Sequence, residues 1–163
     1  MSELRIEKVL NAPVSKVYDA WTQKEHFEAW AGPKGFKCTV KEMSVEADDG
    51  IHYMMANDRG YEMWLKSTYL EIVPNEKIVF IEAISDADGN LQKPPGAPDW
   101  PSHLHHVIEF QELHGATKMI LTASGHETDE KEDVAFDMSK DRMKMGWDGA
   151  FEKLANHVEG SIQ

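Results

Sequence analysis

The chain has 163 residues, of which 41% are hydrophobic and 9% aromatic, so it is long and apolar enough to fold around a core of its own. It carries 17 lysine and arginine residues against 29 aspartate and glutamate residues, which gives a net charge of -12. This balance argues against binding to a nucleic-acid backbone or to an anionic membrane, because both surfaces attract clustered cations.

Cysteine content and hydropathy indicate the cellular compartment of the protein. Cys38 is the only cysteine, so an internal disulfide is excluded and a reducing compartment is natural. No apolar run approaches the roughly 18 residues typical of a membrane span. The first residues, MSELRIEKVL, lack the layout of a signal peptide. We therefore expect one domain over residues 1–163, located in the cytoplasm.

The first part of the chain predicts one strand followed by two short helices. Residues 4–10 alternate between apolar and polar, which is the period of a strand. Pro13 suits the first turn of a helix, where its missing N–H costs nothing. Thr22 and Glu25 form a capping-box pattern, which predicts a second helix over residues 23–31.

The middle of the chain predicts only strands and turns. The expected strands are 36–45, 51–57, 61–73, 77–84, 103–113 and 116–126. Residues 85–102 contain four prolines and form a long loop, a kind of segment that is often functional or mobile. In the strand 51–57, His52 and Tyr53 would exchange faces with a shift of one residue, so its inward face stays open.

The last part of the chain predicts one long amphipathic helix over about residues 130–160, capped by Asp129 or Thr128. One apolar stripe runs along it through Phe136, Met143, Trp147, Ala150, Leu154 and Val158. The element order is then β-α-α-β-β-β-β-β-β-α, an antiparallel sheet with helices on one face. The sequence therefore predicts the α+β class.

Several strings, in this order, carry a resemblance to a known superfamily. They are Ala12-Pro13, the run from Val17 to Thr22, Trp30, Gly32-Pro33, Gly35-Phe36, the run from Tyr69 to Phe80, and Gly146-Trp147 with Leu154. The chain resembles the START/polyketide-cyclase superfamily, also called SRPBCC or helix-grip. Within it, the chain is similar to the bacterial single-domain form of the family named for the activator of the heat-shock-chaperone ATPase.

The resemblance implies a curved antiparallel sheet wrapped around the long C-terminal helix, with a cavity between them. It also implies that the cavity binds apolar or amphipathic small molecules. It does not imply one reaction, because the superfamily includes carriers, cyclases, hydroxylase subunits and chaperone regulators, and fold alone does not set function.

Methionine and tryptophan supply the side chains for such a cavity. The nine methionines are flexible and polarizable, and the five tryptophans offer broad apolar walls, although the same residues could simply fill a core. We consider Met54, Met119, Met143, Trp64 and Trp147 for this role. The residues predicted to bind the ligand are Trp30, Phe36, Tyr53, Met55, Met63, Trp100, His106, Met138, Arg142 and Met145.

Metal binding and nucleophilic catalysis have little support in the sequence. His103 and His105 share one face of a strand, but no further ligand has the spacing to complete a zinc site. Cys38 lies within a predicted strand, and Ser124-Gly125-His126 lacks the strand-to-helix turn of a nucleophile elbow. We expect no metal site and no cofactor.

General acid–base chemistry stays open. Glu62, Glu82, Glu109 and Asp141 could each project into the cavity, where desolvation would raise the pKa of a carboxyl group. His106 and His52 are the other polar candidates for an enzyme. No catalytic residue is assigned, and we expect a binding protein rather than an enzyme.

Three functions therefore stand beside one another. The first is binding of a small apolar or aromatic molecule, gated by the loop around Trp100. The second is a cyclase or hydrolase on the same scaffold. The third is a chaperone-interaction or regulatory protein, which rests on the resemblance alone. A homodimer is compatible with an exposed edge strand.

Overall fold

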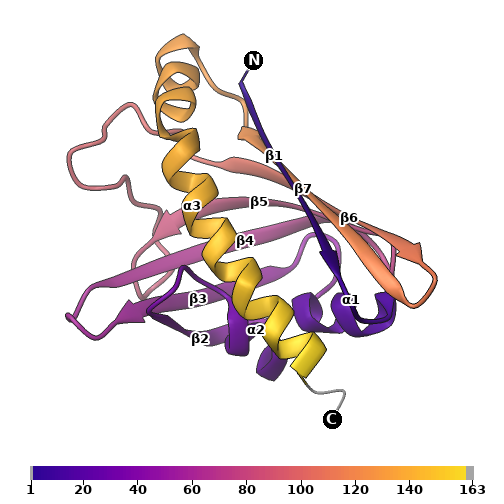
Figure 1. The fold of residues 1–163 in the computed structure, drawn as a ribbon. Helices are drawn as coiled ribbons and strands as arrows, with labels where there is room; N and C mark the ends of the chain where they lie inside the picture. Colours follow the sequence, from indigo (N-terminus) through magenta and orange to yellow (C-terminus); the bar gives the residue numbers. More distant parts are fainter. Residues whose placement is uncertain (1, 161–163) are drawn as a thin grey trace.

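The structure is a computed structural model that describes residues 2–160, and within them one seven-stranded antiparallel sheet faces three helices (Figure 1). The strands are β1 (Glu3–Leu10), β2 (Phe36–Met43), β3 (Gly50–Asn57), β4 (Glu62–Val73), β5 (Lys77–Ser85), β6 (Leu104–Leu113) and β7 (Ala116–Gly125). The helices are α1 (Val14–Thr22), α2 (Lys24–Trp30) and α3 (Glu130–Gly160).

The strand order across the sheet is β1-β7-β6-β5-β4-β3-β2, so every strand except β1 pairs with its sequence neighbour. Strand β1 pairs instead with β7, with Glu3 opposite Ser124 and Leu10 opposite Thr117. Both the element order and the α+β class agree with the prediction. The helix-grip fold expected from the sequence is confirmed.

The sheet is curved, and α3 runs diagonally across its concave side (Figure 1). The pairing register shifts between Tyr69 and Glu71 in β4 and between Val40 and Glu42 in β2. Such bulges increase the local twist and bend the strand that contains them. Helices α1 and α2 lie beside the C-terminal part of α3, so one end of the space between helix and sheet is filled by helices.

Two helix starts were predicted with capping side chains, and the structure shows only one of the two caps. At α3, the Asp129 side chain accepts a hydrogen bond from the Glu132 N–H at 2.8 Å, and the Glu132 carboxylate accepts one from the Asp129 N–H at 3.0 Å. At α2, Gln23 is the N-cap and no side chain caps the helix. The Thr22 hydroxyl instead donates to the carbonyl of Tyr18 at 2.9 Å, because Thr22 is still the last residue of α1.

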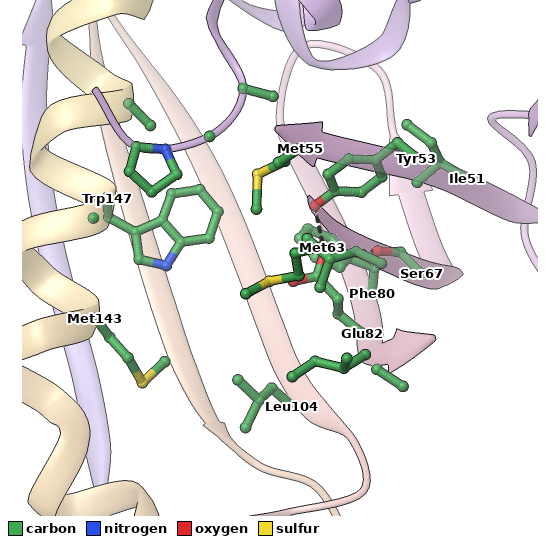
Figure 2. A pocket seen from close by; sticks show the side chains of 18 of the residues that line it. Ile51, Tyr53, Met55, Met63, Ser67, Phe80, Glu82, Leu104, Met143 and Trp147 are labelled. Atoms are coloured by element: carbon green, nitrogen blue, oxygen red, sulfur yellow. Dashed lines mark hydrogen bonds between the residues drawn. The ribbon is translucent and has the colours of Figure 1, made fainter. Parts of the chain in front are cut away.

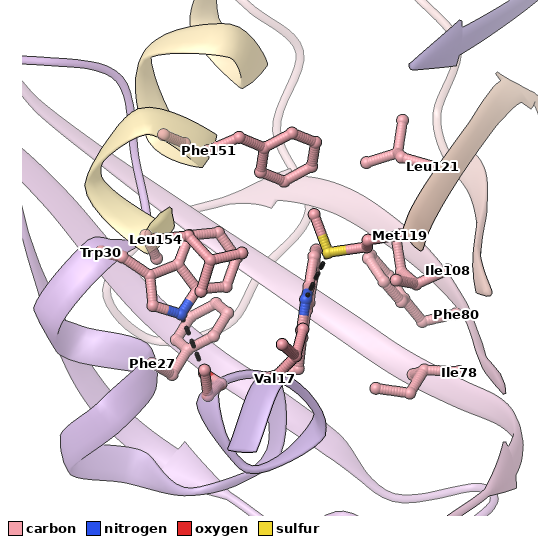
Figure 3. Packing of buried hydrophobic residues seen from close by; sticks show 14 of the residues in the cluster. Val17, Phe27, Trp30, Ile78, Phe80, Ile108, Met119, Leu121, Phe151 and Leu154 are labelled. Carbon is pink, nitrogen blue, oxygen red and sulfur yellow. Dashed lines mark hydrogen bonds between the residues drawn. The ribbon is translucent and has the colours of Figure 1, made fainter. Parts of the chain in front are cut away.

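The core joins α1 and α2 to α3 and to the sheet (Figure 3). The Trp30 indole N–H donates to the Ala20 carbonyl at 2.9 Å, and the Trp21 indole N–H points to the Met119 sulfur at 3.2 Å. Both indoles are almost fully buried, which removes large apolar areas from water while each N–H keeps a partner. The core therefore fixes α1 and α2 on α3. It does not extend to the opposite end of the concave face.

The outer strands of the sheet are β1 and β2. A homodimer through either of these edges stays a prediction. Across residues 2–160, none of the helices combines the length and the apolar character that a membrane crossing requires.

Candidate functional site

A cavity of about 480 Å³ lies between α3 and the inner face of the sheet (Figure 2). Pockets for small molecules typically occupy roughly 300–1,000 Å³. The residues that line it from the helices are Trp21, Phe27, Trp30, Ser139, Arg142, Met143, Gly146, Trp147 and Ala150. Those from the sheet and loops are Ala31, Gly32, Pro33, Ile51, Tyr53, Met55, Met63, Leu65, Ser67, Tyr69, Ile78, Phe80, Glu82, Ala83, Ile84, Pro94, Ala97, Trp100, Pro101 and Leu104.

Strand alternation decides which side chains reach the cavity. In β3, Ile51, Tyr53 and Met55 face it, so His52 and Met54 point to the other side of the sheet. This answers the question that the sequence left open for this strand. The same period brings alternate residues of β4 and β5 to the inner face, among them Ser67 and Glu82.

One polar cluster interrupts the apolar wall. Glu82 Oε2 accepts hydrogen bonds from the Tyr53 hydroxyl at 2.8 Å and from the Ser67 hydroxyl at 2.9 Å. Within the described part of the chain, Glu82 Oε1 makes no hydrogen bond. Desolvation raises the pKa of the Glu82 carboxyl group, against the opposing effect of the two hydrogen bonds. The same burial, with Glu82 nearby, raises the pKa of Tyr53.

The segment between β5 and β6 covers the end of the cavity that α1 and α2 leave free. Trp100 lies against Phe136 of α3, with ring centroids 6.4 Å apart. Lys93 donates to the Trp100 carbonyl and pairs with Glu132 at 3.6 Å. These contacts tie the proline-rich loop to the N-terminal turns of α3. The exposed Arg142 lines the cavity from α3 itself.

The turn after α2 approaches the cavity closely enough to require glycine. Gly32 has a φ of 96°, in the left-handed region, and a Cβ placed there would lie 2.8 Å from the Met55 sulfur. Lys153 of α3 donates to the carbonyls of Pro33 at 3.2 Å and Phe36 at 3.1 Å. The turn is thereby fixed between α3 and the cavity wall.

Six of the ten residues predicted to bind ligand lie in this lining: Trp30, Tyr53, Met55, Met63, Trp100 and Arg142. Two others are misplaced by the prediction, because Met138 and Met145 are 83% and 75% exposed on the outer face of α3. They border the apolar stripe of the helix but do not belong to it. Phe36 is also outside the lining and packs edge-on against Tyr61, with ring centroids 6.1 Å apart.

His106 lies on the inner face of β6, yet behind the wall rather than in it. Its ring stacks on Phe80 at 4.7 Å and meets Trp147 edge-on at 5.8 Å, and both of these residues line the cavity. Its Nδ1 atom has no hydrogen-bond partner among the described residues. Desolvation lowers the pKa of His106 to about 3, so the imidazole is neutral. His106 is therefore outside the lining but in contact with it, and its role in ligand binding stays a prediction.

Other candidates lie on the far side of the sheet. The His52 ring packs against Trp64 at 4.9 Å, and its Nε2 lies 3.1 Å from the Ser85 hydroxyl. Both aromatic side chains are thereby excluded from the cavity. Glu62, Glu109 and Asp141 are exposed, which leaves Glu82 as the candidate acid that lines it.

The histidine cluster and the cysteine offer no reactive centre in this arrangement. His126 lies near His105 and His103, with ring centroids 6.0 and 6.4 Å away. Within residues 2–160, no three histidine, cysteine, aspartate or glutamate side chains are placed to hold a metal ion. Cys38 is buried, and desolvation raises the pKa of its thiol to about 12, which suppresses the thiolate.

Sequence reasoning missed part of the lining. Ser67 and Tyr69 were not considered for the cavity, and Trp147, which was considered, was not among the predicted ligand-binding residues although its indole forms a cavity wall (Figure 2). Glu82 was one of four acids considered without a ranking, although it is in phase with Phe80 and Ile84 in an otherwise apolar strand. An acid at an inward position of a strand indicates either a partner or a site.

Comparisons with known proteins agree with this architecture. The model of the family described as "Activator of Hsp90 ATPase homolog 1-like protein" matches residues 11–159. No curated protein sequence matches the chain.

Several solved structures have the same fold. A protein from Chromobacterium violaceum is similar with a TM-score of 0.78 at 22% identity, over 96% of each chain. One from Arthrobacter aurescens gives 0.82 at 18% identity, over 97% of this chain and 86% of its own. The AHSA1 protein from Silicibacter pomeroyi gives 0.75 at 17% identity, over 98% and 99%. At such identities the likeness shows the fold alone.

Proposed function

The chain belongs to the family of Activator of Hsp90 ATPase homolog 1-like proteins, and we propose that it binds one small apolar or amphipathic molecule in the cavity between α3 and the sheet. The observation that supports this most is a cavity of about 480 Å³ that is apolar except for a few convergent polar groups. An apolar wall supplies affinity, and isolated polar groups orient the ligand.

The composition of the wall favours a broad, flat or flexible ligand. Met55 and Met63 project into the cavity from the sheet and face the Trp147 indole, while Met143 projects into it from α3, one turn before Trp147 (Figure 2). Methionine adapts its rotamer to ligands of different outline, whereas an indole offers a rigid face for stacking. An aromatic or alkyl molecule with one polar end fits this combination.

Native mass spectrometry of gently purified protein tests the proposal. We expect a bound compound, or one-to-one complexes with members of a panel of fatty acids, alcohols, amines and fused aromatic molecules. Met143→Trp should weaken binding, because it adds volume within the cavity. Met138→Trp is the matched control, since the same change falls on the exposed face of α3. Absence of every complex, or equal binding by Met143→Trp and the wild type, would contradict the proposal.

An enzyme on the same scaffold is the second candidate, and Glu82 is the observation that favours it. A carboxyl group whose pKa is raised by an apolar site can act as a general acid or base. In this role, Glu82→Gln would abolish product formation from a polyketide-type or ester substrate while leaving its binding intact. Unchanged turnover in Glu82→Gln would remove this candidate. Regulation of a chaperone stays a prediction from the resemblance.

A further inference from the structure

Glu82 offers the cavity an unused carboxylate oxygen. Tyr53 and Ser67 both donate to Oε2, while Oε1 has no hydrogen bond in the described part of the chain. Tyr53 and Ser67 are buried residues of the same wall, and their hydroxyls hold one oxygen of the carboxyl group in place. The part of Glu82 that is still accessible belongs to the cavity it lines. A ligand group can therefore reach Oε1 without displacing either hydroxyl.

The carboxylate also has no counter-charge. Within residues 2–160, no lysine, arginine or histidine forms an ion pair with Glu82. Arg142 is the other charged residue in the described lining, but it comes from α3 and is exposed. An ionised carboxylate against an apolar wall is costly unless a cation pairs with it. No cation of the described lining pairs with Glu82, so a positive charge that stabilises its ionised form has to come from the ligand.

The surroundings of Glu82 suit an organic cation. Tyr53 and Phe80 contribute aromatic rings to the sheet side of the lining, and Trp147 lies across the cavity on α3 (Figure 2). Ring faces attract ammonium groups, and this attraction strengthens where water is removed. The net charge of -12 also raises the local concentration of cations around the protein.

On the function proposed above, we propose that the ligand is an apolar amine whose ammonium group pairs with Glu82 Oε1 while its hydrocarbon part occupies the methionine- and tryptophan-lined space. Tyr53 and Ser67 act as positioning residues, since they hold Oε2 and stabilise the ionised form of the carboxyl group. Arg142, the other charged residue of the lining, is cationic and repels an ammonium group. Glu82 is therefore the charged residue of the lining that attracts this group.

Three probes with one ring system and different polar groups test this assignment: 2-naphthylmethylamine, 2-naphthylmethanol and 2-naphthoate. Their dissociation constants are measured at neutral pH by titration calorimetry. For the wild type we expect the amine to bind about ten- to a hundredfold more tightly than the alcohol, the range for a charge-assisted hydrogen bond. Glu82→Gln keeps the shape of the side chain and should abolish this preference, while alcohol binding stays within about threefold.

Tyr53→Phe removes one hydroxyl donor and keeps the ring, so it should reduce the preference for the amine without reversing it. Far-UV circular dichroism and the Tm of each variant confirm that it is folded. Equal binding of amine and alcohol would overturn the assignment while leaving the cavity as a binding site. Tighter binding of 2-naphthoate would also overturn it and point to Arg142. Absence of binding by all three probes would overturn the amine assignment, and together with absence of every complex in the mass-spectrometry panel it would overturn the proposed function as well.

Discussion

Replacing His106 by leucine tests how the inner face of β6 responds to acid. The imidazole is 1% exposed between Phe80 and Trp147, and its Nδ1 has no partner among the described residues. Leucine has a similar volume and removes the titratable group. At neutral pH we expect the free energy of unfolding to change by no more than about 1 kcal/mol, because no hydrogen bond of Nδ1 is lost.

The effect should grow as the pH falls. Desolvation lowers the pKa of His106 from 6.5 to about 3. Between these values the unfolded chain binds a proton that the folded chain does not, so the stability present above pH 6.5 is lost progressively toward pH 3. A tenfold change in proton affinity corresponds to about 1.4 kcal/mol, so between pH 6 and pH 4.5 the wild type should lose about 2 kcal/mol through this group.

Urea unfolding followed by tryptophan fluorescence at several pH values between 4.5 and 7.5 measures this loss. The difference between His106→Leu and the wild type isolates the contribution of His106 from those of other titrating groups. His114→Asn serves as a control for loss of an exposed imidazole, because asparagine tolerates the φ of 43° at this turn position. A difference between His106→Leu and the wild type that stays constant from pH 7.5 to 4.5 would refute the burial argument.

Three further predictions concern the helices and the thiol. Asp129→Ala should lower the free energy of unfolding by about 1 kcal/mol, measured in urea, because it removes the acceptor for the Glu132 N–H; an unchanged midpoint would contradict the cap. Met138→Ser and Met145→Ser should each change the free energy of unfolding by less than about 0.5 kcal/mol, since both side chains are exposed. A much larger loss of stability would contradict their exposure. Cys38 should react slowly with a thiol reagent in the folded protein and rapidly in urea, because burial raises its pKa to about 12; fast reaction of the folded protein would refute this.

The element order was predictable because each signal is local. Alternation predicted the strands, Pro13 the start of α1, and a cap by Asp129 or Thr128 the start of α3, where the structure shows Asp129 as the cap. The capping box at Thr22 was wrong because the same local pattern allows α1 to continue through that residue. A pattern of side-chain types does not state which of two adjoining helices a residue belongs to.

The residues that line the cavity were only partly predictable. A side chain must not only point to the inner face but also not be covered by other side chains there. Period-2 alternation places both His106 and Phe80 on the inner face, but only the packed structure puts the Phe80 ring and Trp147 over the imidazole. On α3, Met138 and Met143 differ by five positions and lie on opposite sides of the helix, one exposed and one in the lining. The number of methionines alone does not indicate which of them face the cavity and which face solvent.

The polar cluster of Glu82, Tyr53 and Ser67 could not be predicted from the sequence. Glu82 belonged to a group of acids that the sequence could not rank, and the separation into one lining residue and three exposed ones follows from strand register and helix rotation. Its hydroxyl partners come from two other strands, paired across the sheet as Ser67 opposite Glu82 and Tyr53 opposite Leu65. Such cross-strand neighbours appear only once the register is known.

The most direct test of a binding cavity is a methyl spectrum of methionine-labelled protein titrated with 2-naphthylmethanol. Met55, Met63 and Met143 line the cavity, whereas Met138 and Met145 are exposed on α3. The account predicts saturable shifts of the first three methyl signals and none in the last two. Shifts confined to Met138 and Met145, or no shift at millimolar probe, would contradict it.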